Sequence, residues 1–188
     1  METELLLGKV VSQYIKNELT DKINSLKKNN ITPGLAAILV GDDPASEVYV
    51  RNKSKTFKSN HCYSKTFSLP TDTSEKDLLD LIEQLNNDKK FHGILVQLPL
   101  PSHIDSKKVL NHVDPSKDVD GFHPLNLGHL LEGNPHFIPC TPNGIIKILD
   151  YYRIDTASKH VVIIGRSNIV GKPMFALLSQ KFKIGNST

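Results

Sequence analysis

Tyr49 and Lys53 stand four residues apart, and their types and spacing could do proton-transfer chemistry. They follow an apolar run, residues 35–40, that predicts a buried strand, and a turn that ends in Pro44. On a helix beginning near Pro44, the phenol and the amine share one face. Ligands of open α/β sheets bind at the carboxyl ends of strands, where this helix starts. A lone pair of this kind is more often a solvated helix surface, so the rest of the chain decides its meaning.

A second polar side chain, Gln97, lies in a run that predicts a strand over residues 93–98. Pro99 and Pro101 stop that strand. Strands separated by helical patterns predict a parallel sheet, so Gln97 is expected at the carboxyl edge from which the Tyr49 helix begins. Taken alone, Gln97 could equally hydrogen-bond its own loop.

The elements that must position these residues follow from hydrophobic periodicity. Helices are predicted over about 8–29, 44–60, from 73 onward, 125–131 and 143–152. Strands are predicted over 35–40, 63–69 and 93–98, all in one parallel sheet.

Residues 160–173 predict a second strand, turn and helix. The apolar run 160–165 indicates a fresh buried strand, and Pro173 starts a helix. The glycines at 165 and 171 would let a phosphate approach the backbone, and free amides at the helix amino end would bind it. Arg166 favours a phosphorylated dinucleotide, since a guanidinium can take a 2′-phosphate bidentately. The glycine spacing departs from Gly-x-Gly-x-x-Gly, so this motif alone is weak.

Composition excludes several classes of protein. A net charge of +3 over 188 residues is not the footprint of a nucleic-acid binder, and no apolar run approaches the roughly 20 residues that span a bilayer. Cys62 and Cys140 have neither metal nor redox spacing, which favours the cytosol. The eight histidines and the aspartates at 114–120 match no metal-ligand pattern, so no metal is expected.

Five stretches, in this order, resemble one family, the bifunctional methylenetetrahydrofolate dehydrogenase/methenyltetrahydrofolate cyclohydrolases. They are residues 41–53, 93–101, 117–122, 139–144 and 165–173. The resemblance covers nearly the whole chain, and the five together are highly specific although each alone is modest.

The resemblance implies a three-layer α/β folate-binding domain with a parallel sheet, residues 1–142, followed by the start of a Rossmann-type NADP-binding domain, residues 143–188. The second domain holds about one strand–helix unit, so we expect a fragment or a truncated chain. The implied activity is NADP-dependent oxidation of 5,10-methylenetetrahydrofolate, followed by hydrolysis of the methenyl product to 10-formyltetrahydrofolate. This chemistry belongs to one-carbon metabolism and purine biosynthesis.

The resemblance also implies roles for single residues. Lys53 matches the catalytic lysine and Gln97 the glutamine that cooperates with it. Tyr49 flanks the folate, Pro99 lines the folate pocket, and Asp120 grips the pterin amino edge. The dinucleotide turn is matched by Gly165, Arg166, Ser167, Ile169 and Gly171.

The implied partners are tetrahydrofolate derivatives and a second copy of the chain in a cytoplasmic homodimer, without nucleic acid or membrane. Three alternatives stay open. The chain could be an NAD-dependent or monofunctional relative, or a folate-binding fragment without turnover. It could also be a two-domain amino-acid or shikimate-type dehydrogenase, although nothing in that pattern demands Tyr49 and Lys53 together with Asp120.

Overall fold

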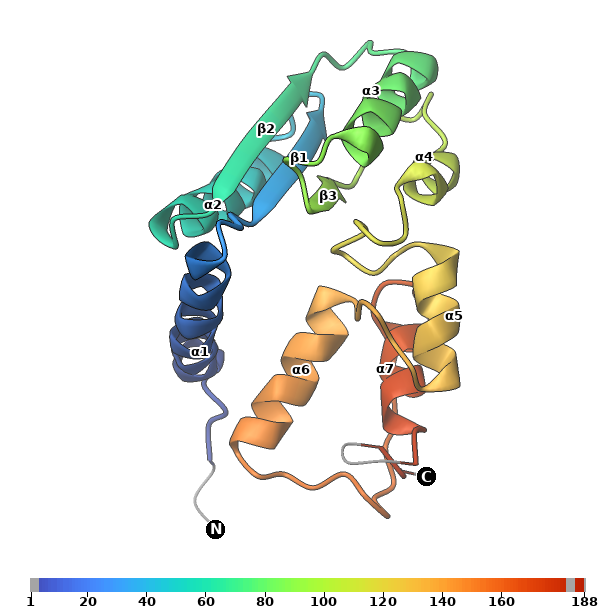
Figure 1. Cartoon of the computed structure of the whole chain (residues 1–188). Coiled ribbons are helices and arrows are strands. Elements are labelled where there is room, and N and C mark those ends of the chain that lie inside the picture. The colour runs from blue at the N-terminus through green and yellow to red at the C-terminus, as the bar shows by residue number, and fades with distance from the viewer. Residues whose placement is uncertain (1–3, 182–184, 188) are drawn as a thin grey trace. The chain divides into compact units, whose positions relative to one another are not determined.

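The structure is a computed structural model that describes residues 4–181 and 185–187 (Figure 1). Its elements, in chain order, are α1 (Gly8–Lys28), β1 (Gly34–Val40), α2 (Pro44–Ser59), β2 (Tyr63–Leu69), α3 (Glu75–Asn87), β3 (Gly93–Val96), α4 (Ser106–His112), α5 (Pro124–Glu132), α6 (Cys140–Tyr151) and α7 (Gly171–Leu178).

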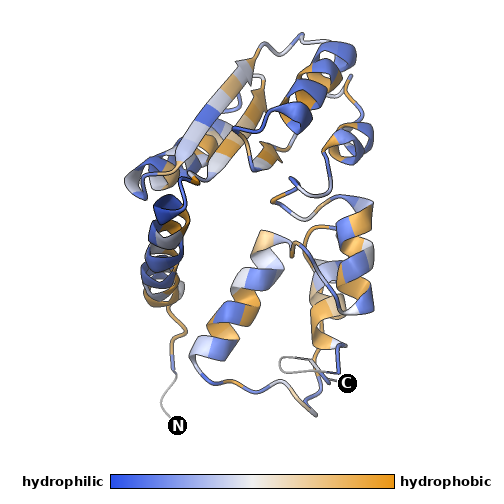
Figure 2. Cartoon of the chain, viewed as in Figure 1, coloured by the Kyte–Doolittle hydropathy of each residue, from blue (hydrophilic) through white to orange (hydrophobic). Residues whose placement is uncertain are grey.

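The three strands form one parallel sheet in the order β2-β1-β3, which confirms the predicted parallel arrangement. Ala37 of the central strand pairs with Thr66 of β2 on one side and Leu95 of β3 on the other. All seven residues of β1 are buried, whereas β2 alternates between exposed and half-buried positions. Figure 2 shows β1 as largely hydrophobic and β2 as more polar, as expected of a central and an edge strand.

Helices cover both faces of this sheet, because alternate residues of β1 point to opposite sides. Ala36, Ile38 and Val40 pack with α3 and α4 in one core cluster. Leu35, Ala37 and Leu39 pack with Val50 of α2 in another. The predicted three-layer α/β arrangement is therefore confirmed.

Most predicted elements are confirmed, with shifted ends. β3 ends at Val96, two residues before the predicted end, and α6 begins at Cys140 rather than at residue 143. Helix α4 was not predicted, although its signal is present. The Asp105 carboxylate accepts from the amide of Lys107 at 2.9 Å, and Val109 is buried.

The predicted strand over residues 160–165 is wrong. This segment has no strand partner among the described residues. Val161 and Ile163 pack on a cluster formed by α5, α6 and α7, but Val162 is 71% and Ile164 is 100% exposed. A strand is defined by its hydrogen-bonded neighbour, and an apolar run does not supply one.

The chain divides into two compact units. One is residues 20–119, with the sheet, and the other combines the residues before and after it. Helix α1 contributes to both units. In the second unit, its first turns lie against α6. The Tyr14 and Tyr151 ring centroids are 5.5 Å apart, and the Leu7 amide donates to the Tyr152 hydroxyl at 2.9 Å.

Among the described residues, no helix has both the length and the hydropathy to cross a membrane.

Candidate active site and dinucleotide turn

Helix α2 carries Tyr49 and Lys53 and has a well-defined start. Pro44 occupies its first turn, and the Asp43 carboxylate caps it by accepting from the Ser46 amide at 2.8 Å. The Ser46 side chain and amide hydrogen bonds lower the pKa of Asp43, which favours the charged form that caps best. The helix therefore begins at the carboxyl end of β1, as the sequence predicts.

Tyr49 and Lys53 lie on one flank of α2. Ser46 and Val50 form the buried stripe against the sheet. Lys53 lies beside that stripe and is half-buried, whereas Tyr49 is 63% exposed. Neither the Tyr49 hydroxyl nor the Lys53 amine bonds to another described residue, so both can engage a ligand.

Gln97 follows β3 directly, and its backbone amide donates to the carbonyl of Ile38 at 2.9 Å. Gln97 is thereby fixed to the neighbouring strand at the carboxyl edge of the sheet. Its side-chain amide donates to the Leu98 carbonyl at 2.7 Å. Gln97 therefore bonds its own loop here, which is one of the two possibilities left open by the sequence. The side-chain carbonyl oxygen has no partner among the described residues. Pro99, next in the chain after a cis peptide bond, is exposed.

The segment before Asp120 is held against the sheet by Lys117, a residue to which the sequence assigned no role. The Lys117 ammonium donates to the carbonyls of Leu85 and Asp88 at 2.9 and 3.0 Å, at the carboxyl end of α3. The Ile94 amide donates to the Lys117 carbonyl at 2.8 Å. The sequence feature that could have drawn attention to Lys117 is its place at the start of the 117–122 motif.

Asp120 lies beside the 139–144 motif, within the second unit. Gly121 has a φ of 69°, and a Cβ there would come 2.9 Å from the Pro139 nitrogen, so the chain needs glycine at this close approach. The Cys140 thiol donates to the Asp120 carboxylate across 3.9 Å. Two motifs that are separate in the sequence thus meet at Asp120, and Cys140 is a neighbour that sequence reasoning missed.

The candidate residues fall into two groups. Tyr49, Lys53, Gln97 and Pro99 belong to the unit that holds the sheet. Asp120 and the turn over residues 165–171 belong to the other unit. No group of three or more histidine, cysteine, aspartate or glutamate side chains within residues 4–181 and 185–187 could hold a metal ion.

In the turn before α7, Gly171 lies close to the backbone of Gly165. A Cβ on Gly171 would overlap the carbonyl oxygen of Gly165, which excludes any larger residue without movement of the backbone. Gly165 itself has a φ of 152° and open space beside its α-carbon. The turn is therefore tight on one side and accessible on the other.

The expectation of free amides at the amino end of α7 is wrong. The Ser167 hydroxyl accepts from the amides of Val170 and Gly171 at 3.1 and 3.3 Å, and the Ser167 carbonyl accepts from Lys172 at 3.0 Å. Ser167 thus closes the turn before α7, a helix whose N-cap residue is Val170. Nothing in the local sequence distinguishes a serine that bonds within its own turn from one that contacts a ligand.

Other amides of the turn before α7 remain available to a ligand. The backbone amides of Arg166, Asn168 and Ile169 donate to no described residue. A Cβ on Gly165 would meet no atom within 4 Å, and Arg166 is exposed. Successive free amides in a turn form a concavity that binds anions.

Comparison with known proteins identifies both parts of the chain. Residues 6–120 match the family described as "Tetrahydrofolate dehydrogenase/cyclohydrolase, catalytic domain", and residues 139–188 match its "NAD(P)-binding domain". The curated "Bifunctional protein FolD" of Streptococcus agalactiae is 54% identical over 180 residues, which is 95% of this chain and 63% of that protein.

Two solved structures are similar as well. The bifunctional FolD enzyme of Campylobacter jejuni has a TM-score of 0.90 at 49% identity, over 92% of this chain and 62% of that one. The Trypanosoma brucei dehydrogenase-cyclohydrolase, solved with NADP cofactor and inhibitor, has a TM-score of 0.90 at 33% identity, over 95% and 62%. The chain thus spans less than two thirds of these relatives. It belongs to the tetrahydrofolate dehydrogenase/cyclohydrolase family.

Proposed function

We propose that this chain acts in one-carbon folate metabolism. The proposed reactions are NADP-dependent oxidation of 5,10-methylenetetrahydrofolate to the methenyl cation and hydrolysis of that cation to 10-formyltetrahydrofolate. The observation that carries the proposal is the placement of Tyr49, Lys53 and Gln97 at adjacent parallel strands. The first two follow β1 on α2, and Gln97 follows β3. Membership of the family, whose named relatives are bifunctional, supports the same activity.

In the proposed hydrolysis, a water loses a proton as it adds to the methenyl carbon. A neutral Lys53 amine can take that proton, because its nitrogen has no competing partner in this unit. The side-chain carbonyl of Gln97 can accept a hydrogen bond from the amine or the water without adding charge. The exposed Tyr49 ring can stack on the folate and offer its hydroxyl to Lys53.

We propose folate-binding roles for Asp120 and Pro99 as well, from the resemblance of their motifs to the family. A carboxylate can accept two hydrogen bonds from an aminopyrimidine edge, which is a strong and directional contact. The proposed domain boundary follows residue 142, so Asp120 would belong to the folate-binding domain. Bound NADP would supply the hydride acceptor for the oxidation. Gly165, Arg166, Ser167, Ile169 and Gly171 would form the turn that holds it, with Ser167 shaping the turn through its hydroxyl.

A Lys53→Met variant tests the assignment. It should lose methenyltetrahydrofolate hydrolysis by about 100-fold or more, the scale of general acid–base catalysis. The matched control is Lys76→Met, at an exposed lysine whose side chain is 3.7 Å from Asp80 on α3. That control should keep its rate and both variants should keep the wild-type circular dichroism. Unchanged hydrolysis in Lys53→Met would remove the lysine from the mechanism.

The preference for NADP over NAD is proposed to come from Arg166. Arg166→Gln should weaken NADP binding about tenfold, the loss of one charge-assisted contact, and leave NAD binding nearly unchanged. Fluorescence titration with both dinucleotides measures the two constants. Equal affinities in the unaltered chain would favour the NAD-dependent alternative.

The assembly and location are proposed from the family resemblance. We expect a homodimer in the cytoplasm, acting in the branch of folate metabolism that serves purine biosynthesis. Analytical ultracentrifugation at micromolar concentration measures the assembly directly. A monomer at all concentrations would contradict it.

A further inference from the structure

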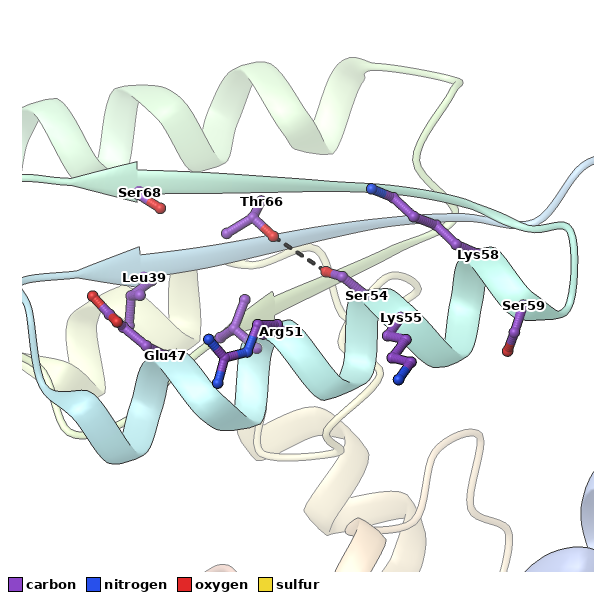
Figure 3. Close-up of a pocket in the computed structure, with 10 residues that line it drawn as sticks. Leu39, Glu47, Arg51, Ser54, Lys55, Lys58, Ser59, Thr66 and Ser68 are labelled. Carbon is purple, nitrogen blue, oxygen red and sulfur yellow. Dashed lines mark hydrogen bonds between the residues drawn. The ribbon is translucent and has the colours of Figure 1, made fainter.

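The other flank of α2 faces a groove that the proposed reaction does not use. The groove encloses about 640 Å³ between α2 and the edge strand β2 (Figure 3). Its polar lining includes Glu47, Arg51, Ser54, Lys55 and Lys58 of α2 and Thr66 of β2. Neither Tyr49 nor Lys53 lines it, because a helix turns about 100° per residue and these side chains point to the opposite flank.

Three cations line this groove without an ion pair. Arg51, Lys55 and Lys58 make no ion pair or side-chain hydrogen bond with any described residue, and Glu47 is the one acid among the lining residues. Elsewhere lysines do find partners, as Lys108 does with Glu75. The groove therefore carries a net positive charge over the eight residues from Arg51 to Lys58, about 10 Å of helix.

Hydroxyl groups complete the polar lining. The Ser54 and Thr66 hydroxyls are 3.2 Å apart and tie α2 to β2, and the Ser64 hydroxyl donates to Ser54 at 3.2 Å. Figure 3 shows Ser54 and Thr66 facing each other and Lys58 reaching from α2 toward β2. Hydroxyls can reorient to donate to an anion, and these are already held in place between two secondary-structure elements.

We propose that this groove is a second binding site, for a small linear polyanion. The volume falls within the range of small-molecule sites, about 300–1,000 Å³. The line of cations matches a ligand with two or more anionic groups several ångströms apart, since each cation can bind one anionic oxygen group. Phosphate and carboxylate chains share this chemistry. The proposal does not rest on the proposed enzymatic function, because it uses none of the same side chains.

Calorimetric titration of the 188-residue chain with two probes, tripolyphosphate and tricarballylate, tests the site. At least one probe should bind at a single site, and its affinity should fall as salt rises. The tighter probe identifies phosphate or carboxylate as the preferred group. If neither binds at low salt, the proposal is wrong.

A matched pair of triple variants locates the binding. Arg51→Gln/Lys55→Gln/Lys58→Gln should weaken the bound probe about tenfold or more, the loss of at least one charge-assisted contact. Lys22→Gln/Lys28→Gln/Lys147→Gln removes the same charge from exposed positions elsewhere and should change affinity less than about twofold. All six residues are exposed, so both variants should fold, which circular dichroism checks. Equal weakening in the two variants would mean non-specific attraction and would overturn the site.

Discussion

Two stretches of this chain share one sequence pattern: an apolar run, then a turn that contains glycine, then a helix. In the first, residues 34–59, the run forms β1, the turn leads to α2, and all strand residues are buried. In the second, residues 160–178, the run forms no strand, and Ile164 is fully exposed, although α7 forms as predicted. The difference lies outside the motif, in whether other strands lie alongside.

A helix satisfies its backbone hydrogen bonds within itself, whereas a strand needs a neighbour. β1 has β2 on one side and β3 on the other. The 160–165 run has only a helical cluster beneath Val161 and Ile163. Local sequence therefore predicted both helices and both turns, but it predicted the strand only where the rest of the unit supplied partners.

The largest expected effect contrasts one isoleucine from each run. Ile38→Ala should lower the free energy of unfolding by about 2–5 kcal/mol, because the fully buried side chain leaves a cavity in the central strand. Ile164→Ala removes the same atoms from an exposed position and should change it by less than about 0.5 kcal/mol. Urea denaturation measures both. Equal losses would mean that the two runs are equally buried in solution.

The next effect contrasts two glycines of the second unit. Gly171→Ala should destabilise the protein by about 1–3 kcal/mol, because its Cβ would press on the Gly165 carbonyl. Gly128→Ala, within α5, meets no atom within 4 Å and should instead stabilise by about 0.5–1 kcal/mol. Thermal unfolding measures whether each substitution lowers or raises the stability of the protein. A harmless Gly171→Ala would show that the turn before α7 is loose.

The smallest effect contrasts two side chains that hold the turns before helices. Asp43 caps α2 with a carboxylate, and Ser167 closes the turn before α7 with a hydroxyl that does not titrate. Because hydrogen bonds from Ser46 lower the pKa of folded Asp43, its contribution is full above the unfolded pKa of about 3.9. It is lost as the pH falls through the lower folded pKa. Asp43→Ser should therefore flatten the stability profile in acid, whereas Ser167→Ala should shift it uniformly. Parallel profiles for wild type and Asp43→Ser would contradict this.

Much of the sheet-containing unit could be predicted from sequence, since apolar periodicity fixes which residues of β1 and α3 face the core. Helix α4 was missed because it is only seven residues long and offers one buried position, Val109. The sequence feature that indicates this helix is Asp105, whose carboxylate caps it by accepting from the Lys107 amide.

Side-chain partners were harder to predict than elements. Nothing local indicates that Lys117 reaches the carbonyls at the end of α3, or that Cys140 lies beside Asp120. These contacts join residues 20 or more positions apart, and they depend on how the loops fold back. Ser167 shows the converse, since a residue predicted to contact a cofactor instead accepts from its own turn and helix.

The most direct measurement is the rate at which this 188-residue chain hydrolyses methenyltetrahydrofolate, followed by loss of methenyl absorbance with no dinucleotide present. Hydrolysis is proposed to need Lys53, Gln97 and Asp120 but not the turn before α7. We predict a rate clearly above that of buffer, lost in Lys53→Met. A rate equal to that of buffer, from a chain that circular dichroism shows to be folded, would contradict the proposed activity of this chain.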